Sequence, residues 1–186
     1  MNNKNILWIT QTALFIALLL SAQIFTRPFG QFITGSCVNF ILVSSCILIG
    51  LRSAAFFATV SPICAFMIIG TPVFPILIPF MMAGNIVLVT VIHIIAGKSF
   101  RQLNRFSYMR FCVAAVSGAV LKFLVLWMGI VRIALDFIPD IKPAQVEALS
   151  ATFSWPQLVT ALIGSSIAIA VIPKLMKALK FTDTVI

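Results

Sequence analysis

Five polar side chains lie inside long apolar stretches of the sequence, where a polar group is costly and is therefore of functional interest. They are Asn39, Asn85, His93, Lys122 and Gln157. Lys122 is the sharpest signal, because it lies near the middle of its stretch, too deep for its ammonium group to reach the membrane surface easily. No Asp or Glu lies in these stretches to pair with it. We expect a neutral amine, solvation by backbone carbonyls or water, or an anionic ligand, and these alternatives stay open.

The other polar groups have two kinds of expected role. Asn39 and Asn85 either tie helices together or bind an amide or hydroxyl group of a substrate. Arg132, ten residues after Lys122, would add a second cation that favours a carboxylate. His93 lacks companions for metal binding and is expected to form a hydrogen bond between helices. The four cysteines lack the spacing of zinc ligands, so we predict no metal site and no cofactor.

Motifs for catalysis and for energy coupling are missing from the sequence. There is no G-x-S-x-G motif, no H-E-x-x-H motif and no cluster of acidic residues. The chain also lacks a P-loop and the buried carboxylates through which secondary transporters generally couple to protons or sodium. We therefore predict that the chain is not an enzyme, and that any accumulation it supports takes its energy from a partner subunit.

The composition is that of a membrane protein. Of the 186 residues, 61% are hydrophobic and 9% are charged, which is too few charges to cover a water-soluble fold of this size. The net charge of +9 lies at the ends of apolar stretches, which indicates membrane orientation rather than binding to nucleic acid. We predict a single all-α domain over residues 1–186, an integral membrane bundle of six transmembrane helices. Their expected ranges are about 5–25, 35–49, 53–69, 81–95, 111–135 and 155–179.

The connections between these helices carry Pro, Gly and polar residues. Pro72, Pro75 and Pro79 cluster before the fourth helix and predict an irregular backbone over 71–80. Irregular backbone at membrane depth persists where protein or a water-filled cavity satisfies it, so this segment is a candidate site wall. A kinked helix that faces lipid is the alternative. Residues 136–154 are expected to form a polar loop.

The distribution of basic residues predicts that the N-terminus and the C-terminus are both cytoplasmic. With that orientation, nine basic residues flank the inner ends of the helices and two or three flank the outer ends. The outer residues are Arg27, Lys142 and, near a helix end, Arg132. The inner residues are Lys4, Arg52, Lys98, Arg101, Arg105, Arg110, Lys174, Lys177 and Lys180.

Small residues recur at intervals of four along the first helix, at Ala13, Ala17 and Ser21. This spacing places them on one face, where another helix can approach closely. They serve either generic packing within the chain or docking of a partner.

With this motif in view, the chain resembles the substrate-binding S components of energy-coupling factor (ECF) transporters. These are small six-helix proteins with an A-x-x-x-A motif on the first helix, matched here by Ala13 and Ala17. Two further stretches, residues 30–39 and 153–158, are similar to poorly characterised S components. They contain further candidate substrate-binding residues, namely Gln31, Thr34, Trp155 and Gln157.

The resemblance implies a function and a set of partners. The small residues of the first helix would dock onto a transmembrane coupling subunit that carries two ATPase subunits, in a bacterial plasma membrane. A pocket open to the outside would bind a vitamin or another micronutrient, covered by the loops 26–34, 70–75 and 136–154. The binding signatures of the biotin, thiamine and riboflavin members are absent, so the substrate is open; Lys122 and Arg132 favour a small anionic vitamin or precursor.

Three other functions stay in view. A six-helix subunit of a membrane enzyme or redox complex would need cofactor ligands, and the single His argues against it. A purely structural membrane protein would have no pocket. A solitary facilitator would transport without ATPases and would tolerate a bulky residue at Ala13.

Overall fold

The computed structural model describes residues 3–97 and 105–178, and within these ranges the chain forms helices, turns and short connections without any strand. Six segments of the described chain are long and apolar enough to cross a membrane. The chain is therefore a multi-pass, all-α membrane bundle, as predicted. Of the basic residues in the charge count, Lys98, Arg101 and Lys180 lie outside the described residues. The α-helices are α1 (Asn3–Thr26), α2 (Gln31–Leu48), α3 (Leu51–Cys64), α4 (Ile78–Ala96), α5 (Arg105–Leu126), α6 (Pro143–Thr152) and α7 (Trp155–Ala178).

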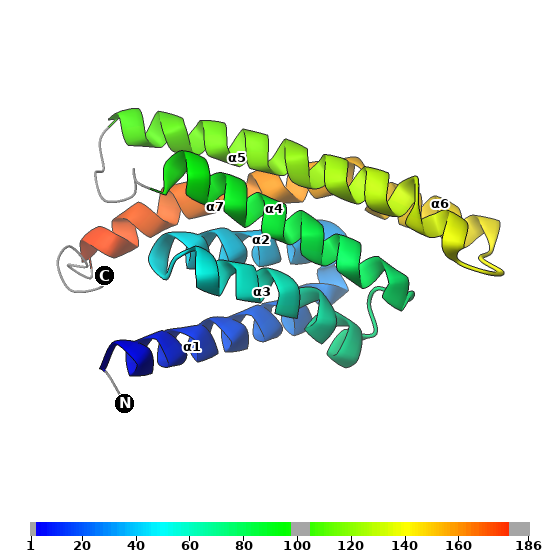
Figure 1. The fold of residues 1–186 in the computed structure, drawn as a ribbon, viewed down its shortest axis with the longest axis horizontal. Helices are drawn as coiled ribbons and strands as arrows, with labels where there is room; N and C mark the ends of the chain where they lie inside the picture. The colour runs from blue at the N-terminus through cyan, green and yellow to red at the C-terminus, as the bar shows by residue number, and fades with distance from the viewer. Residues whose placement is uncertain (1–2, 98–104, 179–186) are drawn as a thin grey trace.

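The long helices run side by side along the length of the molecule (Figure 1). The start of α1 and the end of α7 lie at one end, which we call the terminal end. The short helix α6 lies at the opposite end, which we call the α6 end, together with the α1–α2 and α3–α4 connections. Helix α4 packs against α3 and α5, and α2 packs against α7.

Helix α1 lies at the edge of the bundle and belongs to the least buried of the six membrane-crossing segments. Two of its side chains form hydrogen bonds with α3. Trp8 Nε1 donates to Ser53 Oγ at 2.8 Å near the terminal end, and Gln23 Nε2 donates to Ser61 Oγ at 2.8 Å near the α6 end. One side of α1 is thus fixed to the bundle at two levels.

Two of the predicted helices are continuous in extent but not regular in geometry. A π-helical segment, Ala65–Ile69, continues α3, and another, Trp127–Val131, continues α5. A π-helix closes each turn with one more residue than an α-helix, and such segments are frequent at functional sites. Hydropathy alone does not distinguish them from α-helix, because they are equally apolar.

The expected polar loop over 136–154 is wrong in part, because most of it is helical. A short 3-10 helix spans Ala134–Phe137, and α6 follows after a turn. Pro143 begins α6, where its missing N–H is tolerated. The side chain of Gln145 accepts a hydrogen bond from the backbone N–H of Lys142 at 3.1 Å, which caps the helix.

The second helix begins at Gln31, before the predicted start at 35. Gly30 has a φ of +85°, which interrupts the helical conformation between α1 and α2, whereas Gly35 lies within α2. Before α4, a 3-10 helix over Pro75–Leu77 gives the irregular backbone that was predicted from the prolines. Pro79 falls in the first turn of α4, where proline is tolerated.

Two buried apolar clusters hold the bundle together. The larger one fills the half toward the terminal end and includes Leu42, Phe57, Leu88 and Ile92, all with no exposed surface. The smaller one lies toward the α6 end and includes Leu77, Leu126, Ile130, Leu135 and Phe153.

Close contact between α2 and α7 depends on Gly164. A Cβ atom at this position would lie 2.6 Å from the backbone nitrogen of Phe40 and 2.7 Å from the backbone oxygen of Ser36. We expect Gly164→Ala to push the two helices apart and to cost about 1–3 kcal/mol of stability. Thermal unfolding in detergent, followed by tryptophan fluorescence, measures the loss.

The matched control is Gly118→Ala. Its added Cβ would lie 3.1 Å from a terminal methyl carbon of Leu88 and 3.4 Å from the backbone oxygen of Leu88, which requires a shift of a few tenths of an ångström and less than the backbone clash at Gly164 requires. Equal unfolding temperatures for the two variants would contradict the packing argument.

Candidate ligand-binding cavity

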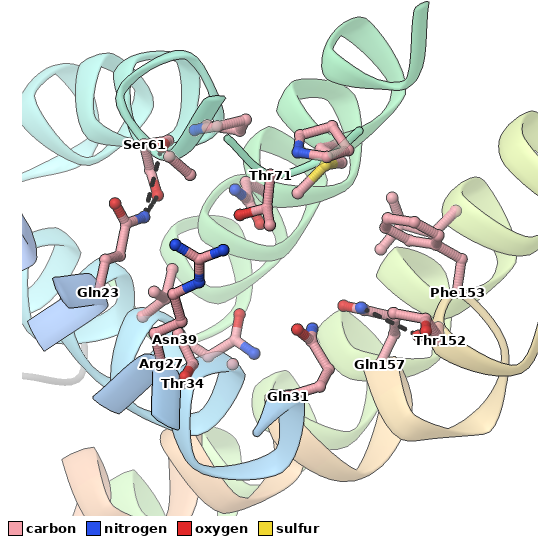
Figure 2. A pocket seen from close by; sticks show the side chains of 18 of the residues that line it. Gln23, Arg27, Gln31, Thr34, Asn39, Ser61, Thr71, Thr152, Phe153 and Gln157 are labelled. Carbon is pink, nitrogen blue, oxygen red and sulfur yellow. Dashed lines mark hydrogen bonds between the residues drawn. The ribbon is translucent and has the colours of Figure 1, made fainter. Parts of the chain in front are cut away.

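A cavity of about 300 Å³ lies in the half of the bundle toward the α6 end. Helices α1 to α5 all contribute to its wall, and α7 contributes with its first turn. The connection at residues 71–73 and the end of α6 complete the wall. Figure 2 shows the labelled polar side chains converging on this space from helices that are distant in sequence. The wall combines amide, hydroxyl and cationic groups with apolar side chains.

Lys122 lies at the deep side of this cavity and is only 3% exposed. Its Nζ donates hydrogen bonds to Asn39 Oδ1 at 2.6 Å and to Asn85 Oδ1 at 2.7 Å. These two bonds link α5 to α2 and α4. The two roles considered for the asparagines are therefore compatible, since both residues connect helices and both line the cavity.

The amide nitrogens of Asn39 and Asn85 each have a hydrogen-bond acceptor on the side away from Lys122, and this orients the two amide oxygens toward Lys122. Asn39 Nδ2 donates to Thr160 Oγ1 at 3.4 Å, and Thr160 Oγ1 donates in turn to the backbone oxygen of Gln157 at 3.2 Å. Asn85 Nδ2 points to the backbone oxygen of Ala58 at 3.5 Å. A charged ammonium group has three donor hydrogens. With two directed at the asparagines, one donor is left for a group in the cavity.

The ionisable groups of the cavity wall are basic. Arg27 lines the cavity along with Lys122, and no carboxylate of the described residues does. Figure 2 shows the guanidinium group of Arg27 pointing into the cavity. The carboxylates in the described part of the chain are Asp136, Asp140 and Glu147, and all are exposed at the α6 end. The cations of the cavity therefore have no carboxylate partner in its wall.

Two further amide side chains are held in place by hydrogen bonds. Gln23 Nε2 donates to both the side chain and the backbone oxygen of Ser61, at 2.8 and 3.3 Å. Gln157 Nε2 donates to the backbone oxygen of Thr152 at 3.2 Å, while its other amide atom faces the cavity (Figure 2). Both glutamines are at least nine-tenths buried. The wall is thus largely pre-arranged.

The structure brings most of the predicted substrate-binding residues together. Six of the eight line the cavity, namely Gln31, Thr34, Asn39, Asn85, Lys122 and Gln157. The segment over 71–80, predicted as a site wall, contributes Thr71, Pro72 and Val73.

Arg132 and Trp155 do not line the cavity. Arg132 is exposed and lies over the ring of Trp127, with its guanidinium carbon 4.8 Å from the ring centroid. The π-helical segment Trp127–Val131 separates it from Lys122 and changes the direction in which it points. Trp155 is 59% exposed and packs against Phe32 on the outside of the bundle.

Several lining residues were not predicted from the sequence. Gln23 could have been predicted, because it is a polar residue near the end of an apolar helix. Arg27 was counted only as a flanking charge. Ser61 and Thr152 gave no signal, because small hydroxyl residues are common in membrane helices.

The remaining predicted residues lie away from the cavity. Ala13, Ala17 and Ser21 are exposed along α1, so this face is open to lipid or to a partner helix. His93 is exposed on α4 rather than packed between helices. Among the described residues no group of three His, Cys, Asp or Glu side chains is placed to hold a metal ion.

No family model, curated protein or solved structure matches this chain. Its function must therefore be inferred from the residues and their geometry.

Proposed function

We propose that this chain is the substrate-capturing subunit of an uptake transporter of the ECF type, which binds a small water-soluble micronutrient. It would work in a bacterial plasma membrane with a separate transmembrane coupling subunit and two ATPase subunits. The observation that carries the proposal is the polar cavity at one end of a six-span bundle, with a buried lysine held at its deep side.

The cavity has the properties of a binding site. Ligand sites are usually concave and largely pre-formed, with a few convergent polar groups set in apolar walls. Here the polar groups of α2, α4 and α5 meet at Lys122, at 2.6 and 2.7 Å from their partners. Holding Lys122 within the membrane is costly, and function is the usual reason for such a group.

The packing beyond the cavity favours capture over free passage. Toward the terminal end, the larger apolar cluster fills the bundle with side chains such as Leu42, Phe57 and Leu88, which have no exposed surface. A solute in the cavity therefore meets a closely packed core rather than a polar path. Transfer across the membrane would require a movement of the whole subunit, which the coupling subunit and its ATPases would drive.

The charge distribution and α1 agree with this arrangement. If the N-terminus is cytoplasmic, as the basic residues predict, the cavity opens toward the cell exterior, where an uptake protein must bind its substrate. The exposed Ala13 and Ala17 on α1 offer a face of small residues to which another membrane helix can dock closely. This is the face that S components use for their coupling subunit.

Transport by reconstituted vesicles tests the proposal. Vesicles that contain only this chain are supplied with the small-molecule fraction of yeast extract, and their contents are identified by mass spectrometry. We expect bound solute but no accumulation. Vesicles that also contain an ECF coupling subunit with its ATPases, supplied with ATP, should concentrate the same solute.

Protein-free vesicles give the background. Accumulation of a solute against its gradient by the chain alone would contradict the proposal and favour a solitary transporter. Failure to retain any solute would argue against a capture subunit.

A further inference from the structure

The two basic residues of the cavity wall, Arg27 and Lys122, have no carboxylate beside them among the described lining residues, and this bears on the chemical class of the ligand. We infer, on the basis of the proposed function, that the substrate is a compact organic anion. Its acidic group binds Lys122 at the deep side after a first contact with Arg27, and its apolar body lies against Met81, Leu126 and Phe153. All five residues line the same cavity.

The first step in the argument concerns Lys122. Asn39 and Asn85 supply two oxygen acceptors, but an amide oxygen carries only a partial charge and leaves the ammonium group electrically unbalanced. Removing such a charge from water is compensated well only when an opposite charge and good hydrogen bonds are both supplied. A ligand carboxylate supplies both, because it accepts the remaining donor hydrogen and balances the charge.

The second step concerns Arg27, which approaches the cavity from a different element. It follows α1 directly and begins the short 3-10 helix Arg27–Phe29, with its side chain exposed. A guanidinium group binds carboxylates with a planar pair of donors. The exposed Arg27 and the buried Lys122 thus place two positive charges at different depths along one path. The electrostatic potential of two such charges attracts anions into the cavity and repels cations.

The third step concerns size and polarity. A volume of about 300 Å³ is at the lower end of the range for small-molecule sites. Met81, Leu126 and Phe153 give apolar contact surface within this volume. A single ring or a short branched chain that carries one acidic group fits these limits.

The experiment uses the purified chain in lipid nanodiscs and the low-molecular-weight fraction of yeast extract as the probe. Ion-exchange chromatography separates this fraction into anionic, cationic and neutral pools, which are brought to equal pH and ionic strength. The unfolding temperature of the chain is then measured in each pool over a dilution series. We expect only the anionic pool to raise it.

Variants of Arg27 test the proposed entrance contact. Arg27→Gln should need about fivefold more of the anionic pool for the same stabilisation, because an exposed charge contributes modestly. Arg27→Lys should recover most of the loss. The matched control Arg132→Gln removes an exposed arginine that lies outside the cavity and should behave as the original chain does.

The outcomes separate this inference from the proposed function. Stabilisation by the neutral or cationic pool alone would overturn the anion and leave the capture function standing. Stabilisation by none of the pools would overturn the capture function as well. Equal responses of Arg27→Gln and the original chain would overturn the role of Arg27.

Discussion

Replacement of Lys122 by methionine is expected to weaken binding of the anionic pool of yeast extract by about 100-fold or more. Methionine keeps most of the aliphatic length of lysine but removes the amino group that donates at the deep side of the cavity. A buried charge pair loses much more than an exposed one when one partner is truncated. The dilution series of the anionic pool, read as unfolding temperature, measures the change.

The control for this variant is Lys174→Met, which alters an exposed lysine on α7 far from the cavity.

A second variant covers the case in which Lys122→Met folds poorly, because the loss of the lysine leaves two buried amide oxygens without a donor. Asn85→Asp preserves the shape of the site and places a carboxylate where an oxygen now lies 2.7 Å from Nζ. This internal carboxylate would balance the charge of Lys122 in place of the acidic group of the ligand and should also weaken binding. Unchanged binding in both variants would remove Lys122 from the site.

Replacement of Ala17 by leucine is expected to reduce coupled uptake to the background while ligand binding stays within about twofold of the original chain. The side chain of Ala17 is exposed on α1 and does not line the cavity. Close contact between membrane helices depends on small residues, and a leucine would hold a docking helix away. Vesicles that contain the coupling subunit and its ATPases measure uptake, and the anionic pool measures binding.

The matched control is Ala170→Leu, which makes the same change at an exposed alanine on α7. Uptake should be retained in that variant. Normal uptake by Ala17→Leu would mean that partner docking does not use the small residues of α1.

The fold was largely predictable because lipid imposes a simple rule on the sequence. Each crossing segment must be long, apolar and helical, and the six segments therefore stand out. The irregular parts follow other rules. The π-helical segments Ala65–Ile69 and Trp127–Val131 depend on local packing, and α6 is a short helix that hydropathy does not detect.

The candidate site was predictable where its chemistry conflicts with its surroundings. Lys122, Asn39 and Asn85 are polar groups in apolar stretches, and they meet in the structure. The sequence predicted that Arg132 binds substrate and treated Arg27 only as a flanking charge, whereas the structure places Arg27 and not Arg132 in the cavity wall. The direction of each side chain depends on the turn or π-helical segment next to it, and only the structure provides that.

Helix α1 has a consequence for communication between the two faces of the subunit. Its inner side contributes Gln23 to the cavity wall, and its outer side carries Ala13 and Ala17. The same helix therefore contacts the cavity on one side and carries the proposed docking surface for a partner subunit on the other. A solute that displaces the amide of Gln23 would weaken one of the two hydrogen bonds between α1 and α3, while the bond between Trp8 and Ser53 would still hold the other end of α1.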